Sequence, residues 1–256
     1  MNNFFTFRRF GRLFVKHTAE NYRTYLMSLG VLCGVFLLGG AFLFYMLDQP
    51  PDPGFQTVLF AMLLLISGTI FTSTVFSDYG IKRKAIAALT LPASSFEKYL
   101  VGWLYSYPIF LILYTCVFYL LLTGLASLKQ WPGFHFEIFN LFQQDMIVFI
   151  VLYSILHAIA IYGAVYFNKL HFIKTGFAFF IGYGISIILN TLFLKFLTGE
   201  DVRPAIPFGY LNFDSNNQYY SISKTGTIPE TILIVLMLAA VLIWIAAYYR
   251  LKEKQV

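Results

Sequence analysis

Six apolar runs, each long enough to cross a bilayer as a helix, constrain the fold of this chain more than any other feature. They cover residues 25–47, 55–77, 99–124, 146–167, 173–195 and 229–249. A hydrocarbon core about 30 Å thick needs about 20 helical residues, and no Asp, Glu, Lys or Arg lies well inside any run. Only 12% of residues are charged, against about 25% in a soluble domain. The sequence therefore predicts an all-α integral membrane protein, with six transmembrane helices in a single domain, residues 1–256.

The basic residues divide unequally between the two sides of such a bundle. An even number of spans places both termini on one side, together with the second and fourth connections. Fourteen of the eighteen Lys and Arg residues fall on that side. The opposite side holds eight of the twelve acids and four cations: Lys129, Lys195, Arg203 and Lys224. Because cytoplasmic loops carry the excess of Lys and Arg, we predict that both termini are cytoplasmic.

Residues 3–22 combine aromatic and charged side chains. One helical face carries the rings of Phe4, Phe7 and Phe14, and another carries the cations Arg9, Arg12 and Lys16. This pattern is typical of an amphipathic helix that lies in the membrane interface, with rings in the acyl boundary and cations at anionic headgroups. The alternative is a disordered basic tail, which the high aromatic content of the segment disfavours.

The three connections on the acidic side differ in character. Residues 48–54 form a Pro-rich turn, and residues 125–145 carry five aromatic side chains, as suits a segment at the outer interface. The longest connection, residues 196–228, contains prolines and a polar stretch around Asp214. A structureless connection of this length is uncommon, so we expect either short re-entrant interfacial helices or an exposed outer loop.

The spans carry few side chains that indicate chemistry. The sequence contains no GxxxxGK[ST], GxSxG or HExxH motif, and no span holds the carboxylate that ion-coupled carriers usually need. His157 has two interpretations: a substrate contact or proton relay, or a neutral histidine hydrogen-bonded to a neighbouring helix. Without an acidic companion we favour the second. No metal, cofactor or catalytic group is predicted.

Small and sulfur-containing side chains have structural interpretations. Cys33 and Cys116 lie in apolar runs without metal-ligand spacing and are expected to be buried free thiols. Gly30 and Gly34 form a GxxxG pattern that lets helices approach closely. For this pair we favour packing within the chain over a contact between subunits.

The stretch Gly80 to Leu100 is the most specific part of the sequence. Residues 81–90 fit a short helix with cations at its start, and Pro92 disfavours helix at the preceding residue. Ser94 and Glu97 then have the spacing of a capping box, from which the third span can start. The alternative is a basic loop that serves only as a topology anchor.

This layout resembles the type-two ABC exporter permeases. Those permeases often carry an acid after the second span, a short helix, a Leu-Pro-x-Ser turn and a Lys entering the third span. Here the corresponding elements are Asp78, residues 81–90, Leu91 to Ser94, and Lys98. The acid is Asp rather than the commoner Glu, and the last outer connection is more polar than a re-entrant pair.

The resemblance implies the permease subunit of a bacterial inner-membrane exporter, which dimerises and binds a separate ATPase subunit. Residues 81–90 would be the coupling helix that docks on the ATPase, and the chain itself would not be an enzyme. The implied partner-binding residues are Asp78, Lys82, Arg83, Lys84, Ile86, Leu89, Leu91, Pro92, Ser94, Glu97 and Lys98.

Two other classes of function remain alternatives. A scaffold or assembly subunit of a larger membrane complex would have stable partners but no ATPase. A membrane enzyme would need polar residues from different spans and loops to converge at one site: His157, His135, Asp145 or Glu200.

Overall fold

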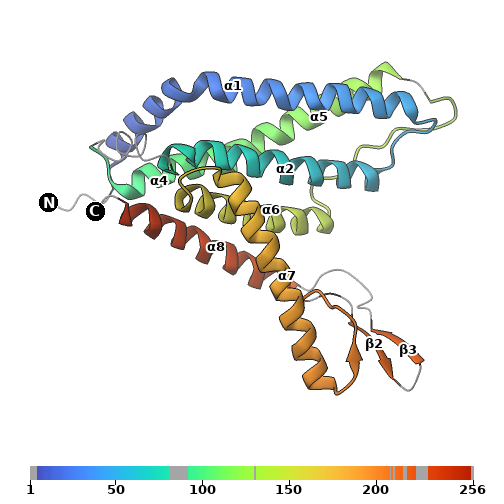
Figure 1. The fold of residues 1–256 in the computed structure, drawn as a ribbon. Coiled ribbons are helices and arrows are strands. Elements are labelled where there is room, and N and C mark those ends of the chain that lie inside the picture. Colours follow the sequence, from blue (N-terminus) through green and yellow to red (C-terminus); the bar gives the residue numbers. More distant parts are fainter. Residues whose placement is uncertain are drawn as a thin grey trace.

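The computed structural model describes residues 5–80, 92–129, 131–207, 209, 211–215, 218–222 and 230–254. As predicted, this part of the chain contains six helices long and apolar enough to span a membrane. They are α1 (Phe7–Met46), α2 (Pro53–Gly80), a third helix Ser95–Leu128, α6 (Gln144–Tyr166), α7 (His171–Thr198) and α8 (Glu230–Glu253). Figure 1 shows that α1 begins and α8 ends at the same end of the bundle.

The prediction of a separate N-terminal helix followed by a first span is wrong in its boundaries. Residues Phe7–Met46 form one continuous helix of 40 residues, drawn as an unbroken ribbon in Figure 1. Such a helix is about 60 Å long, roughly twice the thickness of a hydrocarbon core. Arg23, Thr24 and Tyr25 lie at the expected junction, and none of them breaks a helix, so the hydrogen-bond ladder continues through it.

The third helix has an irregular middle. It runs as α4 (Ser95–Leu104), a π-helical turn η1 (Tyr105–Ile109) and α5 (Phe110–Leu128), with Pro108 inside the turn. Proline has no N–H and its ring collides with the carbonyl four residues earlier, so a wider turn accommodates it. The turn separates α4 from α5 within one long helix.

The expectation that both cysteines are buried is wrong. Cys33 in α1 is half-buried, and Cys116 in α5 is exposed.

The interior consists of two clusters of large side chains. Phe60, Tyr114 and Phe118 belong to the cluster built from α1, α2, α5, α6 and the segment before α6. Phe76 and Ile161 belong to the second cluster, built from α2, α4, α6 and α8. The second cluster lies at the end of the bundle where α1 and α4 begin and α2 and α8 end, which we call the basic end.

The described residues of the connection after α7, 199–207, 209, 211–215 and 218–222, contain no re-entrant helix. They include a three-stranded antiparallel sheet of β1 (Asp201–Val202), β2 (Leu211–Ser215) and β3 (Gln218–Ile222). Asp201 pairs with Asp214, and Phe213 pairs with Tyr220. The Lys195 ammonium donates to Asp201 Oδ1 at 2.5 Å, which lowers the pKa of that carboxyl and joins α7 to the sheet. Alternation of polar and aromatic residues in this segment favours strands.

Helix α7 diverges from the rest of the bundle. It crosses α6 closely, since a β-carbon on Gly163 would lie 1.8 Å from Thr175 Oγ1. None of its described residues is buried, and it carries the sheet away from the other helices (Figure 1).

The expectation that Gly30 and Gly34 pack within the chain is also wrong. A β-carbon on either glycine would meet no heavy atom of a described residue within 4 Å. Both lie on a face of α1 that other described helices leave uncovered, because α1 packs mainly through the residues around Phe36 and Phe44.

Candidate functional site

Helix α4 begins at a capping box. The Ser94 hydroxyl accepts a hydrogen bond from the Glu97 backbone N–H at 3.2 Å, and the Ser94 N–H donates to Glu97 Oε2 at 3.0 Å. The Ser-x-x-Glu spacing predicted this geometry, and the structure confirms it. The start of the third helix is therefore fixed immediately after Pro92.

Glu97 also joins α4 to α1. Its Oε1 accepts from the Thr6 backbone N–H at 2.9 Å and from Arg9 Nη2 at 2.8 Å, while Oε2 accepts from Arg9 Nε at 2.5 Å. The Glu97 side chain is fully buried, and that of Arg9 is 32% exposed. We call Thr6, Arg9, Ser94 and Glu97 the Glu97 clamp. Each carboxylate oxygen has two donors, so the buried charge is compensated by an ion pair and by backbone dipoles.

The clamp was not predicted from the sequence. The sequence predicts that Arg9 faces lipid headgroups, and that Glu97 caps a helix and belongs to the partner-binding set. Their pairing joins positions 88 residues apart, a separation that local patterns do not report. The available signal was the placement of a single acid at the start of an apolar span, where an ionised side chain needs a basic partner.

Aromatic rings reinforce the same contact between helices. Phe14 of α1 stacks on Tyr105 at a centroid distance of 4.8 Å, and Phe96 of α4 packs edge-to-face on Tyr248 of α8 at 6.0 Å. Phe14, expected at the membrane interface, thus contacts the bundle. These contacts make α1, α4 and α8 one unit at the basic end.

The end of α2 is held against α6 and α8. A β-carbon on Gly80 would lie 2.7 Å from the Ala164 carbonyl oxygen and 2.8 Å from that of Phe167. Lys254 Nζ donates to the Tyr79 carbonyl oxygen at 3.0 Å. The backbone on both sides of residues 81–91 is therefore anchored, by Gly80 before this segment and by the Glu97 clamp after it.

The predicted partner-binding residues fall into two groups. Asp78 is half-buried in the last turn of α2, Pro92 is exposed, and Lys98 is buried with 3% exposure. The remaining members, with Phe4 from the membrane-interface set, lie outside the described residues: Lys82, Arg83, Lys84, Ile86, Leu89 and Leu91. The structure thus brings Ser94 and Glu97 together at the start of α4, and it places Asp78 in the last turn of α2.

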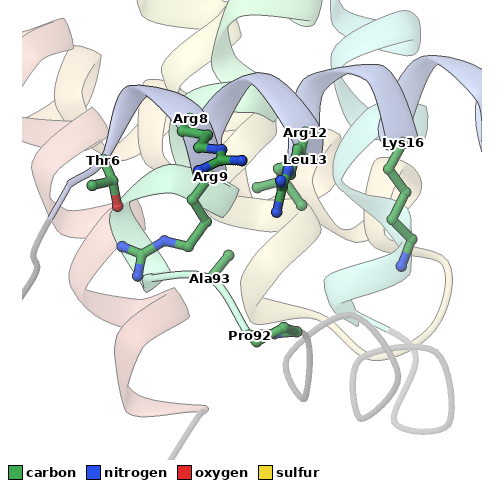
Figure 2. A pocket seen from close by; sticks show the side chains of 8 residues that line it. All are labelled: Thr6, Arg8, Arg9, Arg12, Leu13, Lys16, Pro92 and Ala93. Atoms are coloured by element: carbon green, nitrogen blue, oxygen red, sulfur yellow. The ribbon is translucent and has the colours of Figure 1, made fainter.

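A cavity of about 620 Å³ lies between the first turns of α1 and the turn before α4. We call it the basic pocket. Figure 2 shows its lining, in which cationic side chains of α1 face the chain at Pro92 and Ala93. The lining residues are Thr6, Arg8, Arg9, Arg12, Leu13, Lys16, Pro92 and Ala93.

His157 is fully buried where α6, α8 and η1 meet. The Trp244 indole N–H donates to its Nδ1 at 3.0 Å, so Nδ1 is an acceptor and the proton resides on Nε2. Nε2 lies 2.9 Å from the Ser106 hydroxyl, which donates onward to the Gly102 carbonyl at 2.8 Å. Both ring nitrogens are thus used in contacts between helices.

The polar residues near His157 are also paired. Tyr107 OH lies 2.6 Å from the Ser154 hydroxyl, and Tyr153 OH donates to the Ser106 carbonyl at 3.0 Å. Among the described residues no group of three His, Cys, Asp or Glu side chains has a metal-binding arrangement. This polar cluster fits a connection between α4, α6 and α8 better than a reaction centre.

No family model, curated protein or solved structure matches this chain.

The function therefore has to be inferred from the residues and geometry of the chain itself. At the basic end, two fixed helix ends flank a basic segment, beside a cationic cavity. The arrangement has the chemistry of a binding surface: charged and polar groups on rigid helices.

Proposed function

We propose that this chain is the permease subunit of an ATP-driven exporter of the type-two ABC class, working as a dimer with a separate ATPase subunit. The observation that carries the proposal is that the two helix ends flanking residues 81–91, at Gly80 and at Ser94, are both held by the bundle. Gly80 packs on the α6 backbone, and the Glu97 clamp holds the first turn of α4. A segment held at both ends by rigid helices can transmit a displacement applied to it.

The charge distribution supports an orientation with the basic end in the cytoplasm. The resemblance to the exporter permeases implies that the membrane is the inner membrane of a bacterial cell. Fourteen of eighteen cations belong to the connections and termini at that end. An ATPase in the cytoplasm would then meet residues 81–91 directly. The sequence has no phosphate-binding loop of its own, so ATP hydrolysis is assigned to the partner.

The proposal is tested by reversing the charges of the segment. The tagged chain is purified from its native membrane, and we expect an ATPase subunit to copurify. Reversal of Lys82, Arg83 and Lys84 to Glu should abolish copurification or reduce stimulated ATP hydrolysis at least tenfold. The matched control reverses three exposed cations of the same end: Arg23, Lys169 and Lys252.

Coupling through residues 81–91 is supported if only the variant with reversed charges at Lys82, Arg83 and Lys84 loses the ATPase or its stimulated hydrolysis, and if its helical content is normal. An unchanged complex with unchanged hydrolysis contradicts it. Stable copurified partners without any ATPase favour the second candidate function, a non-transporting scaffold. That candidate is supported by α7, none of whose residues is buried, so that much of its surface is left for lipid or for other helices.

A further inference from the structure

The basic pocket holds more positive charge than the Glu97 clamp neutralises. Its lining contains four cations, and no acid lines it among the described residues. Arg9 is paired with Glu97. Lys16 lies 3.6 Å from Glu20 in an exposed pair, which screens its charge only weakly.

Arg8 and Arg12 are the unneutralised members. Both are exposed, lie one helical turn apart on α1 and form no ion pair with a described residue. Like charges at this spacing repel each other. An anion placed between the two guanidinium groups would convert this repulsion into two attractive contacts.

The chemistry of the pocket favours a phosphate group. Each guanidinium presents a planar pair of N–H donors that matches two phosphate oxygens. The pocket also lies at the N-terminus of α1, which begins at Phe7 and whose macrodipole favours an anion there. A phosphate group is larger than a carboxylate, and the volume of about 620 Å³ leaves room for it.

The surroundings of the pocket favour a lipid as the source of that phosphate. Leu13 gives the lining an apolar side, and the Phe7 side chain, 83% exposed, lies beside the cations on the same helix. Helix α1 then continues from the pocket into an apolar span. A headgroup in the pocket would leave its acyl chains alongside that helix.

We propose that the basic pocket, between the first turns of α1 and the Pro92–Ala93 turn, binds the phosphate of an anionic phospholipid through Arg8 and Arg12. The site rests on the proposed orientation, in which the basic end lies at the cytoplasmic surface of the membrane, but not on an ATPase partner. A bound headgroup would contact both α1 and the chain that leads into α4, and so make their packing sensitive to lipid composition.

The test measures lipid binding to the full-length protein in detergent by native mass spectrometry. The ligands are dioctanoyl phosphatidic acid, dioctanoyl phosphatidylcholine and inorganic phosphate. The pocket variant is Arg8→Gln with Arg12→Gln. The matched control, Arg23→Gln with Lys252→Gln, removes the same charge from exposed positions that do not line the pocket.

We expect phosphatidic acid to bind the native protein at least tenfold more tightly than phosphatidylcholine or free phosphate. The pocket variant should lose about tenfold in affinity and the control less than twofold. An equal loss of affinity in the pocket variant and in the control would overturn the site, because it would indicate that the lipid is attracted by the overall charge of the protein. If free phosphate bound as tightly as phosphatidic acid, the proposal that the bound phosphate belongs to a lipid would be overturned.

A second measurement tests the occupant in the native membrane. A photoreactive residue replaces Ala93, which lines the pocket without binding the phosphate, and its crosslinks are analysed. Labelled phospholipid supports the proposal, whereas a crosslink to an acidic protein assigns the pocket to a protein partner and overturns it.

Discussion

Glu97 is the residue whose substitution is expected to lower the stability of the protein most. Glu97→Ala leaves Arg9 and the Thr6 N–H without their acceptor and removes the cap of α4. Loss of one partner of a buried ion pair costs about 3 kcal/mol, so the unfolding temperature in detergent should fall by several degrees. In the control, Glu253→Ala, an exposed pair with Arg250 is lost and the effect should stay below about 1 kcal/mol. Equal shifts for the two variants would show that the clamp adds nothing.

Gly80 is constrained by the backbone of another helix. In Gly80→Ala the new methyl group would lie within 3 Å of two carbonyl oxygens of α6, which cannot rotate away as a side chain does. We expect a loss of about 1–3 kcal/mol, measured as the midpoint of thermal unfolding. Gly182→Ala in α7, where no described atom lies within 4 Å, should be neutral or slightly stabilising. A neutral Gly80→Ala would mean that the contact between α2 and α6 adapts freely.

At the scale of elements, the third helix is two pieces joined by a π-helical turn. Its first piece belongs to the basic end through the Glu97 clamp, and α5 belongs to the cluster around Tyr114 and Phe118. The turn between them is held by the contact of Ser106 with His157. Ser106, His157 and Trp244 therefore connect this turn to α6 and α8.

The strength of this connection can be measured with a double-mutant cycle. Ser106→Ala and His157→Leu should each destabilise the protein, and their interaction energy should be about 0.5–1.5 kcal/mol because they share a buried hydrogen bond. His157→Leu combined with Ser127→Ala is the control, since Ser127 is exposed and donates only to Gly124. Additive effects in the first cycle would remove the proposed link between η1 and α6.

For the whole molecule, the proposed orientation makes a prediction about labelling from outside the cell. Single cysteines replace Tyr219 in β3 and Lys252 in α8, both exposed, in a background in which Cys33 and Cys116 are changed to Ser. A membrane-impermeant maleimide should label position 219 in intact cells and position 252 only after permeabilisation. Both positions should react in detergent. The opposite pattern would invert the topology and place residues 81–91 away from a cytoplasmic ATPase.

Local patterns in the sequence predicted much of the fold, because hydrophobic length and helix capping act over a few residues. The six apolar runs correspond to six long helices, and the Ser94 capping box forms as its spacing indicated. The predictions that failed concern continuity and partners. Helix α1 passes through the expected break near Arg23, and the described part of the connection after α7 contains a sheet that the sequence analysis did not predict.

Three features of this chain can be read from its residues alone: the long apolar helices, the basic connections and the start of the third helix. Only the tertiary structure decided which polar groups meet: Glu97 with Arg9, His157 with Ser106 and Trp244, and Gly80 with the α6 backbone. The difference arises from the distance along the chain over which each interaction acts. Apolar burial and capping depend on neighbours along the chain, whereas a buried charge or imidazole is satisfied by whichever distant helix packing brings within hydrogen-bond distance.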